Sequence, residues 1–267
     1  MKTTILATSK LCKTFSTGGV QQHVLKNLDM EIYEGDFTVI MGSSGAGKST
    51  LLYALAGMDK PTLGAVTFAG KNISGLSNDK LAIFRRDHCG FVFQQMYLLD
   101  NMSILDNILA SGLLVNKNRT AVAAKAKALL QQFNITEATW RKFPTQVSGG
   151  EAQRAAIARA LINTPQIVFA DEPTGALNSA NGQAVLDALT EVNHQGWSHG
   201  QADAADPRNR KQSIVMVTHD LKSALRGSRI IYLRDGGIQG ECQLGAYTDD
   251  DAQRRTTLKN FLAEMGW

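Results

Sequence analysis

Cysteine is scarce in this chain, and it is not arranged as a disulfide framework or a zinc site requires. Cys12, Cys89 and Cys242 are odd in number and far apart, and there is no C-x-x-C pair. This usage fits a protein that is kept reduced in the cytosol.

Long apolar runs are also missing. The N-terminal sequence MKTTILATSK contains no apolar signal core. No uninterrupted apolar run reaches the roughly 18 residues that a membrane-spanning helix needs. The sequence therefore predicts a protein made and kept in the cytosol, so that any membrane role depends on a partner.

A strong excess of one charge is absent as well. The formal charge is +4, and the charged residues are spread along the chain. Nucleic-acid binders more often carry a concentrated basic stripe, so no nucleic-acid partner is expected. The 267 residues, 43% of them hydrophobic, are enough for one large domain or two small ones with a normal core. We find no internal repeat.

Short apolar runs alternate with helical stretches, which predicts an α/β fold. The runs Phe37 to Met41, Ile167 to Ala170 and Ile214 to Val217 are apolar on both faces, as buried parallel strands are. Each run ends at a polar cluster, namely GSSGAGKST, DEPT or THD. Ligands bind outside the carboxyl ends of such strands, so the three clusters predict a single site.

Other segments flank this predicted core. Ile5 to Ile32 and Ala65 to Phe93 contain strand-like pieces and turns, which suggest an antiparallel flank. Residues from about Asn101 to Ile162 read as helices, with Pro144 marking a break before the last. The polar segment Gln195 to Gln212 reads as a surface insertion.

A phosphate-binding loop follows the first apolar run. Gly42 to Ser49 fits G-x-x-x-x-G-K-[ST] between a predicted strand and a helix beginning near Ser49. Glycines let successive N–H groups point at phosphate oxygens, and the helix N-terminus adds its dipole. Lys48 supplies a charge to the β- and γ-phosphates, and Ser49 supplies a hydroxyl to Mg²⁺. A chance match is the alternative, and the strand–loop–helix context disfavours it.

An acidic pair follows the second run. Asp171 at a strand end is our candidate Mg²⁺ ligand, and Glu172 beside it is our candidate general base for the attacking water. Taken alone, Asp-Glu before Pro173 and Thr174 would be read as a helix cap and first-turn acid.

His219 follows the third run in VTHD. Its imidazole could donate a hydrogen bond to a γ-phosphate or to the attacking water. A lone histidine usually has no such role, and His23, His88, His194 and His199 are assigned none.

Ser148-Gly149-Gly150-Glu151 precedes the helical stretch Ala152 to Ile162. The spacing of Ser148 and Glu151 is that of a capping box. Two adjacent glycines each cost about 1 kcal/mol in a helix, so they suggest a close approach to the backbone, and a phosphate is the natural guest there. A head-to-tail dimer would bring this second anion site onto the nucleotide of the other chain.

With these motifs together, the chain resembles the ATP-binding subunits of ABC transporters over nearly its whole length. GSSGAGKST resembles the Walker A motif, VSGGEAQR the signature, IVFADEPT the Walker B motif, VTHD the switch-histidine loop, and GFVFQQ the glutamine loop. The resemblance assigns Gln94 to Mg²⁺ and to a position near the membrane partner. Phe15 takes the place of an aromatic residue that stacks on adenine.

The resemblance implies ATP and Mg as cofactors. The implied fold is a P-loop NTPase (RecA-like) parallel core sheet with an antiparallel β flank and an inserted α-helical subdomain. The implied catalytic residues are Glu172, His219, Lys48 and Gln94. The implied metal ligands are Ser49, Gln94 and Asp171. The implied nucleotide contacts are Phe15, Gly42, Ser43, Ser44, Gly45, Ala46, Gly47, Lys48, Ser49, Thr50, Ser148, Gly149 and Gly150.

The expected organisation is one nucleotide-binding domain. Residues 1–95 and 163–240 would form the catalytic core and β flank, and residues 96–162 the helical signature subdomain. Residues 195–212 would be the surface insertion, and 241–267 a C-terminal extension. The expected partners are a second copy of the chain and an integral membrane permease, which would hold the protein at the cytoplasmic face of the membrane.

Three positions depart from the family pattern. Val147 replaces the usual Leu, and Glu151 replaces the frequent Gln. Asn178 stands where most relatives have Asp, in a loop that crosses the dimer interface.

The sequence GALNS and the tail ending in FLAEMGW are similar to the bacitracin- and lantibiotic-resistance exporters, within the clan of macrolide exporters and lipoprotein-release ATPases. The alternatives within that clan are lipoprotein release and cell-division signalling. A soluble ABC ATPase acting on nucleic acid and a non-catalytic nucleotide-binding regulator are the rivals outside it.

Overall fold

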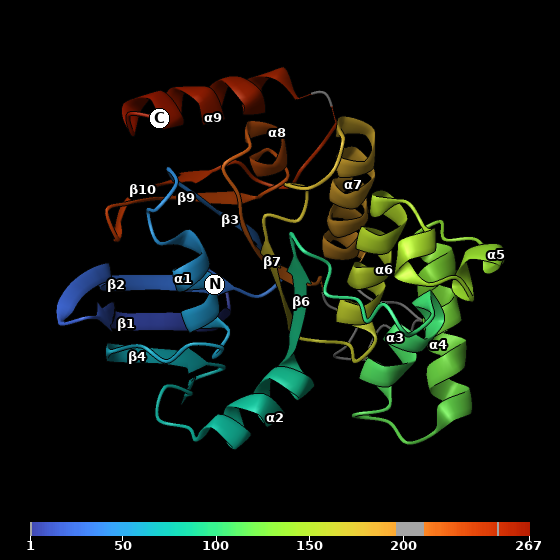
Figure 1. The fold of residues 1–267 in the computed structure, drawn as a ribbon. Coiled ribbons are helices and arrows are strands. Elements are labelled where there is room, and N and C mark those ends of the chain that lie inside the picture. Colours follow the sequence, from blue (N-terminus) through green and yellow to red (C-terminus); the bar gives the residue numbers. More distant parts are fainter. Residues whose placement is uncertain (1, 196–210, 250) are drawn as a thin grey trace. The chain divides into compact units, whose positions relative to one another are not determined.

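A computed structural model describes residues 2–195, 211–249 and 251–267 (Figure 1). The chain forms two compact units. The first unit combines Met1–Ala82 with Ser213–Trp267, and the second is the continuous segment Ile83–Gln212. Most of the predicted insertion at 195–212 lies outside the described residues, and the predicted division of the domain stays a prediction.

An antiparallel sheet forms the first part of the first unit. Its strands, in spatial order, are β2 (Val20–Tyr33), β1 (Thr4–Thr17), β4 (Leu63–Phe68) and β5 (Lys71–Asn72). The hairpin between β1 and β2 turns at Gly18 and Gly19, whose φ values of 60° and 83° suit glycine. The predicted antiparallel flank is confirmed for these strands.

The flank prediction is wrong for the end of the segment Ala65 to Phe93. Residues 78–88 form helix α2 (Asn78–His88), and β6 (Cys89–Phe93) pairs in parallel with a later strand. Leu81 and Phe84 are buried one helical turn apart, whereas the other side chains of α2 are exposed or half-buried. Two apolar anchors in a charged segment gave too weak a periodicity to predict the helix.

A mixed sheet completes the first unit. Its strands, in order, are β10 (Gly237–Gln243), β9 (Arg229–Arg234), β3 (Phe37–Met41) and β8 (Ser213–Val217). β3 is parallel to both β8 and β9, and every residue of β3 is buried. The helices of this unit are α1 (Lys48–Leu55), α8 (Leu221–Ala224) and α9 (Ala252–Glu264).

The second unit contains the parallel pair of β6 and β7 (Ile167–Asp171) and a group of helices. The helices are α3 (Ile104–Gly112), α4 (Arg119–Gln132), α5 (Glu137–Trp140), α6 (Gly149–Leu161) and α7 (Ser179–Gln195). A 3-10 turn at Pro144–Gln146 stands at the predicted break before α6. Buried alanines on α6, among them Ala155 and Ala156, let its neighbours pack closely.

Among the described residues, no helix combines the length and apolar character that crossing a membrane requires.

Candidate functional site

The phosphate loop joins β3 to α1 and depends on its glycines. A side chain on Gly42 would place Cβ 2.1 Å from the carbonyl oxygen of Leu233 in β9. Gly45 and Gly47 have φ values of 79° and 99°, in the left-handed region. Gly47 caps α1 without any side-chain hydrogen bond, and the first turn of α1 contains no acid. A helix N-terminus without a neighbouring acid favours an anion, as phosphate binding requires.

Lys48 is held inside this loop. Its ammonium donates hydrogen bonds to the carbonyl oxygens of Gly42, at 2.9 Å, and Ser43, at 3.0 Å. The loop thus curls around its own cation, which fits the position predicted for a lysine that meets phosphates.

His219 lies at the same sheet edge as the phosphate loop. Val217 at the end of β8 is opposite Ile40 of β3, and the N–H of Thr218 donates to the carbonyl oxygen of Ile40 at 3.2 Å. The two parallel strands therefore end side by side, and the phosphate loop follows one while exposed His219 follows the other. The structure brings these two predicted clusters together within the first unit.

Phe15 lies near the end of β1 and is 42% exposed. The ammonium of Lys13 is 4.9 Å from the centroid of its ring, so a cation supports the ring. Lys13 is itself fixed by Asp59 and by the carbonyl oxygen of Lys60. An exposed, supported ring of this kind can stack on a planar base.

The second unit holds the glutamine loop and the acidic pair. Phe93 of β6 is opposite Asp171 of β7, so Gln94 and Glu172 both follow the carboxyl ends of neighbouring parallel strands. A Cβ on Gly175 would lie 3.0 Å from the side-chain amide of Gln94. The loop after Glu172 therefore packs directly against Gln94.

Glu172 has a backbone φ of 45°, which is rare for a residue other than glycine. Its carbonyl oxygen accepts a hydrogen bond of 3.0 Å from the N–H of Gly175, which closes a tight turn. Conformations of this kind cost on the order of 1–3 kcal/mol and concentrate at functional sites. The direction of the Glu172 side chain is therefore set by this turn as well as by the end of β7.

The signature sequence begins α6 with a full capping box, as predicted. The hydroxyl of Ser148 donates to Oε2 of Glu151 at 2.8 Å and accepts from the Glu151 N–H at 3.2 Å. The Ser148 N–H also donates to Oε2 at 3.0 Å. These bonds, the backbone one foremost, hold the pKa of Glu151 below its ordinary value.

The signature glycines have a neighbour within the chain. A Cβ on Gly150 would lie 2.5 Å from Oδ1 of Asn181 in α7, and one on Gly149 would lie 3.3 Å from Leu177. Packing against the start of α7 therefore already requires a small residue at Gly150. The predicted role of these glycines, to admit a phosphate, stays a prediction.

Asn178 replaces the usual aspartate without loss of a local hydrogen bond. Its Oδ1 accepts from the N–H of Asn181 at 3.0 Å, at the start of α7. Asparagine and aspartate are equally good at this capping task. The departure noted in the sequence thus leaves the start of α7 intact.

Gln153 is a residue that the sequence argument missed. Its fully buried side chain donates through Nε2 to the carbonyl oxygens of Phe93 and Pro173, each at 2.9 Å. It therefore ties the signature helix to the last residue of β6 and to the segment that follows β7. A polar residue on the alanine-rich buried face of α6 was the available signal.

The predicted site residues thus form two sets. The first unit carries Phe15, the loop from Gly42 to Thr50, and His219. The second carries Gln94, the signature from Ser148 to Gly150, and the Asp171–Glu172 pair. The assembly of the two sets into one centre stays a prediction.

The donors in these sets suit a magnesium nucleotide. The phosphate loop offers helix N–H groups and an ammonium to phosphates. The predicted metal ligands Ser49, Gln94 and Asp171 offer hydroxyl, amide and carboxylate oxygens, which are the donors that Mg²⁺ prefers.

Comparison with known proteins gives consistent matches. The family model described as "ABC transporter" matches residues 25–175. The bacitracin export ATP-binding protein BceA of Halalkalibacterium halodurans is 36% identical over 262 residues, which cover 98% of this chain and 96% of that protein. The macrolide export ATP-binding/permease protein MacB of Escherichia coli is 41% identical over 226 residues, 85% of this chain but only 32% of MacB.

A solved structure matches as well. It is a dimeric ATP-binding cassette in a post-hydrolysis state with ADP and phosphate bound. The TM-score is 0.77 at 35% identity, over 91% of this chain and 100% of the other. This likeness confirms the predicted α/β fold with a phosphate-binding loop.

Proposed function

Because the chain belongs to the ABC transporter family, whose ATP-binding subunits hydrolyse ATP, we propose that it drives an export permease from the cytoplasmic face of the membrane. The observation that carries the proposal is the phosphate loop and His219 at one sheet edge, with the acidic pair and Gln94 at the ends of another strand pair. We propose that both units form one nucleotide-binding domain in which these residues surround the triphosphate.

Nucleotide binding would use groups already in place. The ring of Phe15 stacks on adenine, and the start of α1 with Lys48 receives the β- and γ-phosphates. Ser49, Gln94 and Asp171 would hold Mg²⁺, which would neutralise phosphate charge. Lys48 then exchanges its loop carbonyl partners for phosphate oxygens.

Hydrolysis would depend on Glu172. As general base it takes a proton from the attacking water, while His219 donates a hydrogen bond to the γ-phosphate. Gln94 contacts the Glu172 turn at Gly175. A change at the γ-phosphate can therefore shift Gln94 and the surface beside it on which the permease would dock.

Dimerisation would complete each site. Ser148 and Gly149 are exposed at the start of α6, where helix N–H groups favour an anion. In a head-to-tail pair they would receive the γ-phosphate held by the partner's phosphate loop. The post-hydrolysis cassette that this chain resembles is a dimer, which supports the arrangement. ATP favours the closed pair, and that difference in binding drives the permease.

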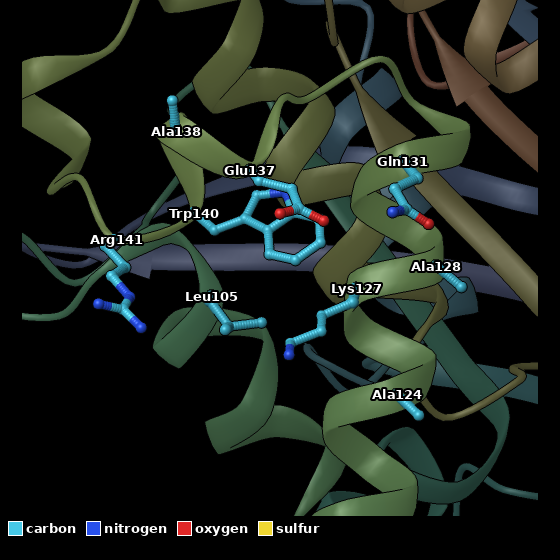
Figure 2. Close-up of a pocket in the computed structure, with 9 residues that line it drawn as sticks. All are labelled: Leu105, Ala124, Lys127, Ala128, Gln131, Glu137, Ala138, Trp140 and Arg141. Carbon is cyan, nitrogen blue, oxygen red and sulfur yellow. The ribbon is translucent and has the colours of Figure 1, made fainter.

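The permease would dock on the helical part of the second unit, beside Gln94. Tyr97 and Leu99, which follow Gln94, are 63% and 52% exposed. Another feature of the same unit is a hollow of about 690 Å³ between α3, α4 and α5. Figure 2 shows the residues that line it. Trp140 and Leu105 give it an apolar floor, and Lys127 and Glu137 add charges at its side. An amphipathic cytosolic helix of a permease fits such a surface.

The substrate class that we favour is an antimicrobial peptide. The bacitracin exporter subunit matches nearly end to end, whereas the match to MacB covers about a third of that protein. Co-expression with the permease of the neighbouring reading frame should raise resistance to bacitracin-type peptides. Unchanged resistance, together with release of lipoproteins, would favour the lipoprotein-release alternative.

The catalytic proposal is tested by Glu172→Gln. The variant should bind ATP normally, lose at least about a hundredfold in turnover, and accumulate as an ATP-bound dimer, because the base is lost while the phosphate contacts remain. The measurements are steady-state phosphate release and size-exclusion chromatography with ATP. Glu264→Gln, an exposed change on α9, is the matched control. Normal turnover of Glu172→Gln would remove Glu172 as the base.

A further inference from the structure

The C-terminal helix α9 packs against the rest of the first unit through one stripe of side chains. Arg254, Leu258 and Leu262 are buried at four-residue spacing, whereas their neighbours are mostly exposed. Near its end, Met265 lies against β10, where a Cβ on Gly240 would be 3.0 Å from its sulfur. Figure 1 shows α9 beside α8 and the strands β9 and β10.

Arg254 is a buried cation surrounded by backbone carbonyl groups. Its guanidinium donates to Leu225, at 2.7 Å, and to Gly227, at the end of α8. It also donates to Leu244, Gly245 and Ala246, at 2.9 to 3.2 Å, in the segment that follows β10. A fork of this geometry fixes both segments at once, and a cation at a helix C-terminus is favourable.

Tyr247 adds a second connection. Its ring centroid is 4.3 Å from the guanidinium carbon of Arg226 and 5.5 Å from that of Arg254. Arg226 is also buried and lies just after α8. The end of α8 is thus bound to the C-terminal segment through two stacked arginines.

Helix α8 begins at Leu221, two residues after His219. Asp220 caps it, accepting from the Ser223 N–H at 2.7 Å, and its own N–H donates to the Thr218 hydroxyl at 3.0 Å. A helix of a single turn is not stable alone, so its position depends on what holds its two ends. Asp220 holds the first end, and Arg254 holds the second.

We propose that Arg254 is a positioning residue for His219, and that Arg254 and Tyr247 together form a clamp that sets the switch-histidine loop. The inference rests on the proposed role of His219 in ATP hydrolysis. Arg254 is not among the predicted nucleotide or metal contacts, and it acts through α8. Loss of its contacts lets α8 and the preceding loop shift, and displacements of about 1 Å at a catalytic group can cost up to a hundredfold in rate.

The first test compares Arg254→Met with Arg255→Met in the full-length chain. Arg255 is adjacent, exposed and on the same helix, so it controls for removal of a cation from α9. We expect Arg254→Met to lower kcat for ATP about tenfold or more and to leave the Kd for ATP within about twofold, because the phosphate loop is untouched. Arg255→Met should match the wild type. Unchanged kcat in a folded Arg254→Met chain would overturn the proposal.

The second test separates positioning from general destabilisation. In a double-mutant cycle, Arg254→Met should cause little further loss of kcat once His219 is replaced by alanine, because both changes remove the same function. An equal fold-loss in the presence and absence of His219 would refute the clamp. If Arg254→Met does not fold, Tyr247→Leu weakens the same contact more gently and is put through the same cycle.

The outcomes also separate this inference from the proposed function. If the wild-type chain, alone or with its permease, does not hydrolyse ATP, the proposed function fails first. If the wild type is active and His219→Ala is impaired while the Arg254 and Tyr247 variants behave as wild type, only the clamp fails.

Discussion

At the scale of single residues, Glu172 and Lys48 show how local geometry prepares the site. The left-handed turn at Glu172 and the two carbonyl oxygens that accept hydrogen bonds from Lys48 are both formed by the protein chain itself. The turn at Glu172 is therefore preorganised, whereas the Lys48 ammonium has to exchange its two carbonyl partners for phosphate oxygens.

The capping box of α6 predicts a dependence of stability on pH. The pKa of Glu151 is lowered in the folded chain, so its contribution is present above the ordinary glutamate pKa of about 4.3 and is lost as the pH falls through the lower folded value. Glu151→Gln should therefore destabilise the chain most at neutral pH, by under about 1 kcal/mol because the site is solvated. Urea unfolding at pH 7 and pH 3 measures this, with exposed Glu137→Gln as control. A difference that grows toward low pH would contradict the assignment.

Individual residues also mark what the sequence could predict about the site. The phosphate loop, the acidic pair and His219 were recognisable because each is a polar cluster after an apolar strand. Arg254 was not, because in sequence it looks the same as its exposed neighbour Arg255. Its burial is decided by carbonyl groups from segments that only the fold brings together.

At the scale of elements, α6 is the helix on which the second unit is organised. Its start packs against α7 at Gly150, and its buried face is bound to the ends of β6 and β7 through Gln153. One helix therefore connects the signature to the glutamine loop and to the acidic turn.

Gln153→Leu should expose the importance of that connection. Leucine fills the space but leaves the carbonyl oxygens of Phe93 and Pro173 without this donor. We expect a loss of roughly 1–3 kcal/mol in the free energy of unfolding, because two carbonyl groups lose a donor at about 1–3 kcal/mol each, while removal of the buried Oε1 of Gln153, which has no hydrogen-bond partner among the described residues, offsets part of that cost. Denaturant unfolding measures it, and Gln131→Leu, an exposed change on α4, is the control. Equal stability of the two variants would show that the buried bonds contribute little.

The elements themselves were predictable to different degrees. The strands predicted at 37–41, 167–170 and 214–217 are observed as β3, β7 and β8, because continuous apolar runs of that length have few alternatives. The helix α2 was not foreseen, since only Leu81 and Phe84 anchor it. The irregular register of β1 with β2 depends on bulges that no local pattern encodes.

At the scale of the whole molecule, the proposed dimer places Lys48 of one chain and Ser148 of the other at each nucleotide. This leads to a complementation experiment. Lys48→Ala and Ser148→Ala chains should each be nearly inactive alone. When the two variants are mixed one to one in the presence of the permease, random pairing makes half of the dimers mixed. Each mixed dimer has one of its two sites intact, so about a quarter of the wild-type rate should return. The comparison is a mixture of Lys48→Ala chains with Glu172→Gln chains, whose Ser148 and Gly149 are intact. In these mixed dimers, the one intact phosphate loop lacks its general base. No recovery in the first mixture would contradict the shared site.

The separation of β3 from its partner strands has a consequence for synthesis. β3 pairs with β8 and β9, which follow the whole second unit in the chain. While a ribosome translates that unit, at roughly 5–20 residues per second, the nascent β3 is without those two neighbours for on the order of ten seconds or more. The continuous second unit can form its contacts in that interval, whereas the phosphate loop cannot be fixed until its flanking strands emerge. A nascent chain paused there presents an apolar strand, which is the kind of surface that ribosome-associated chaperones bind.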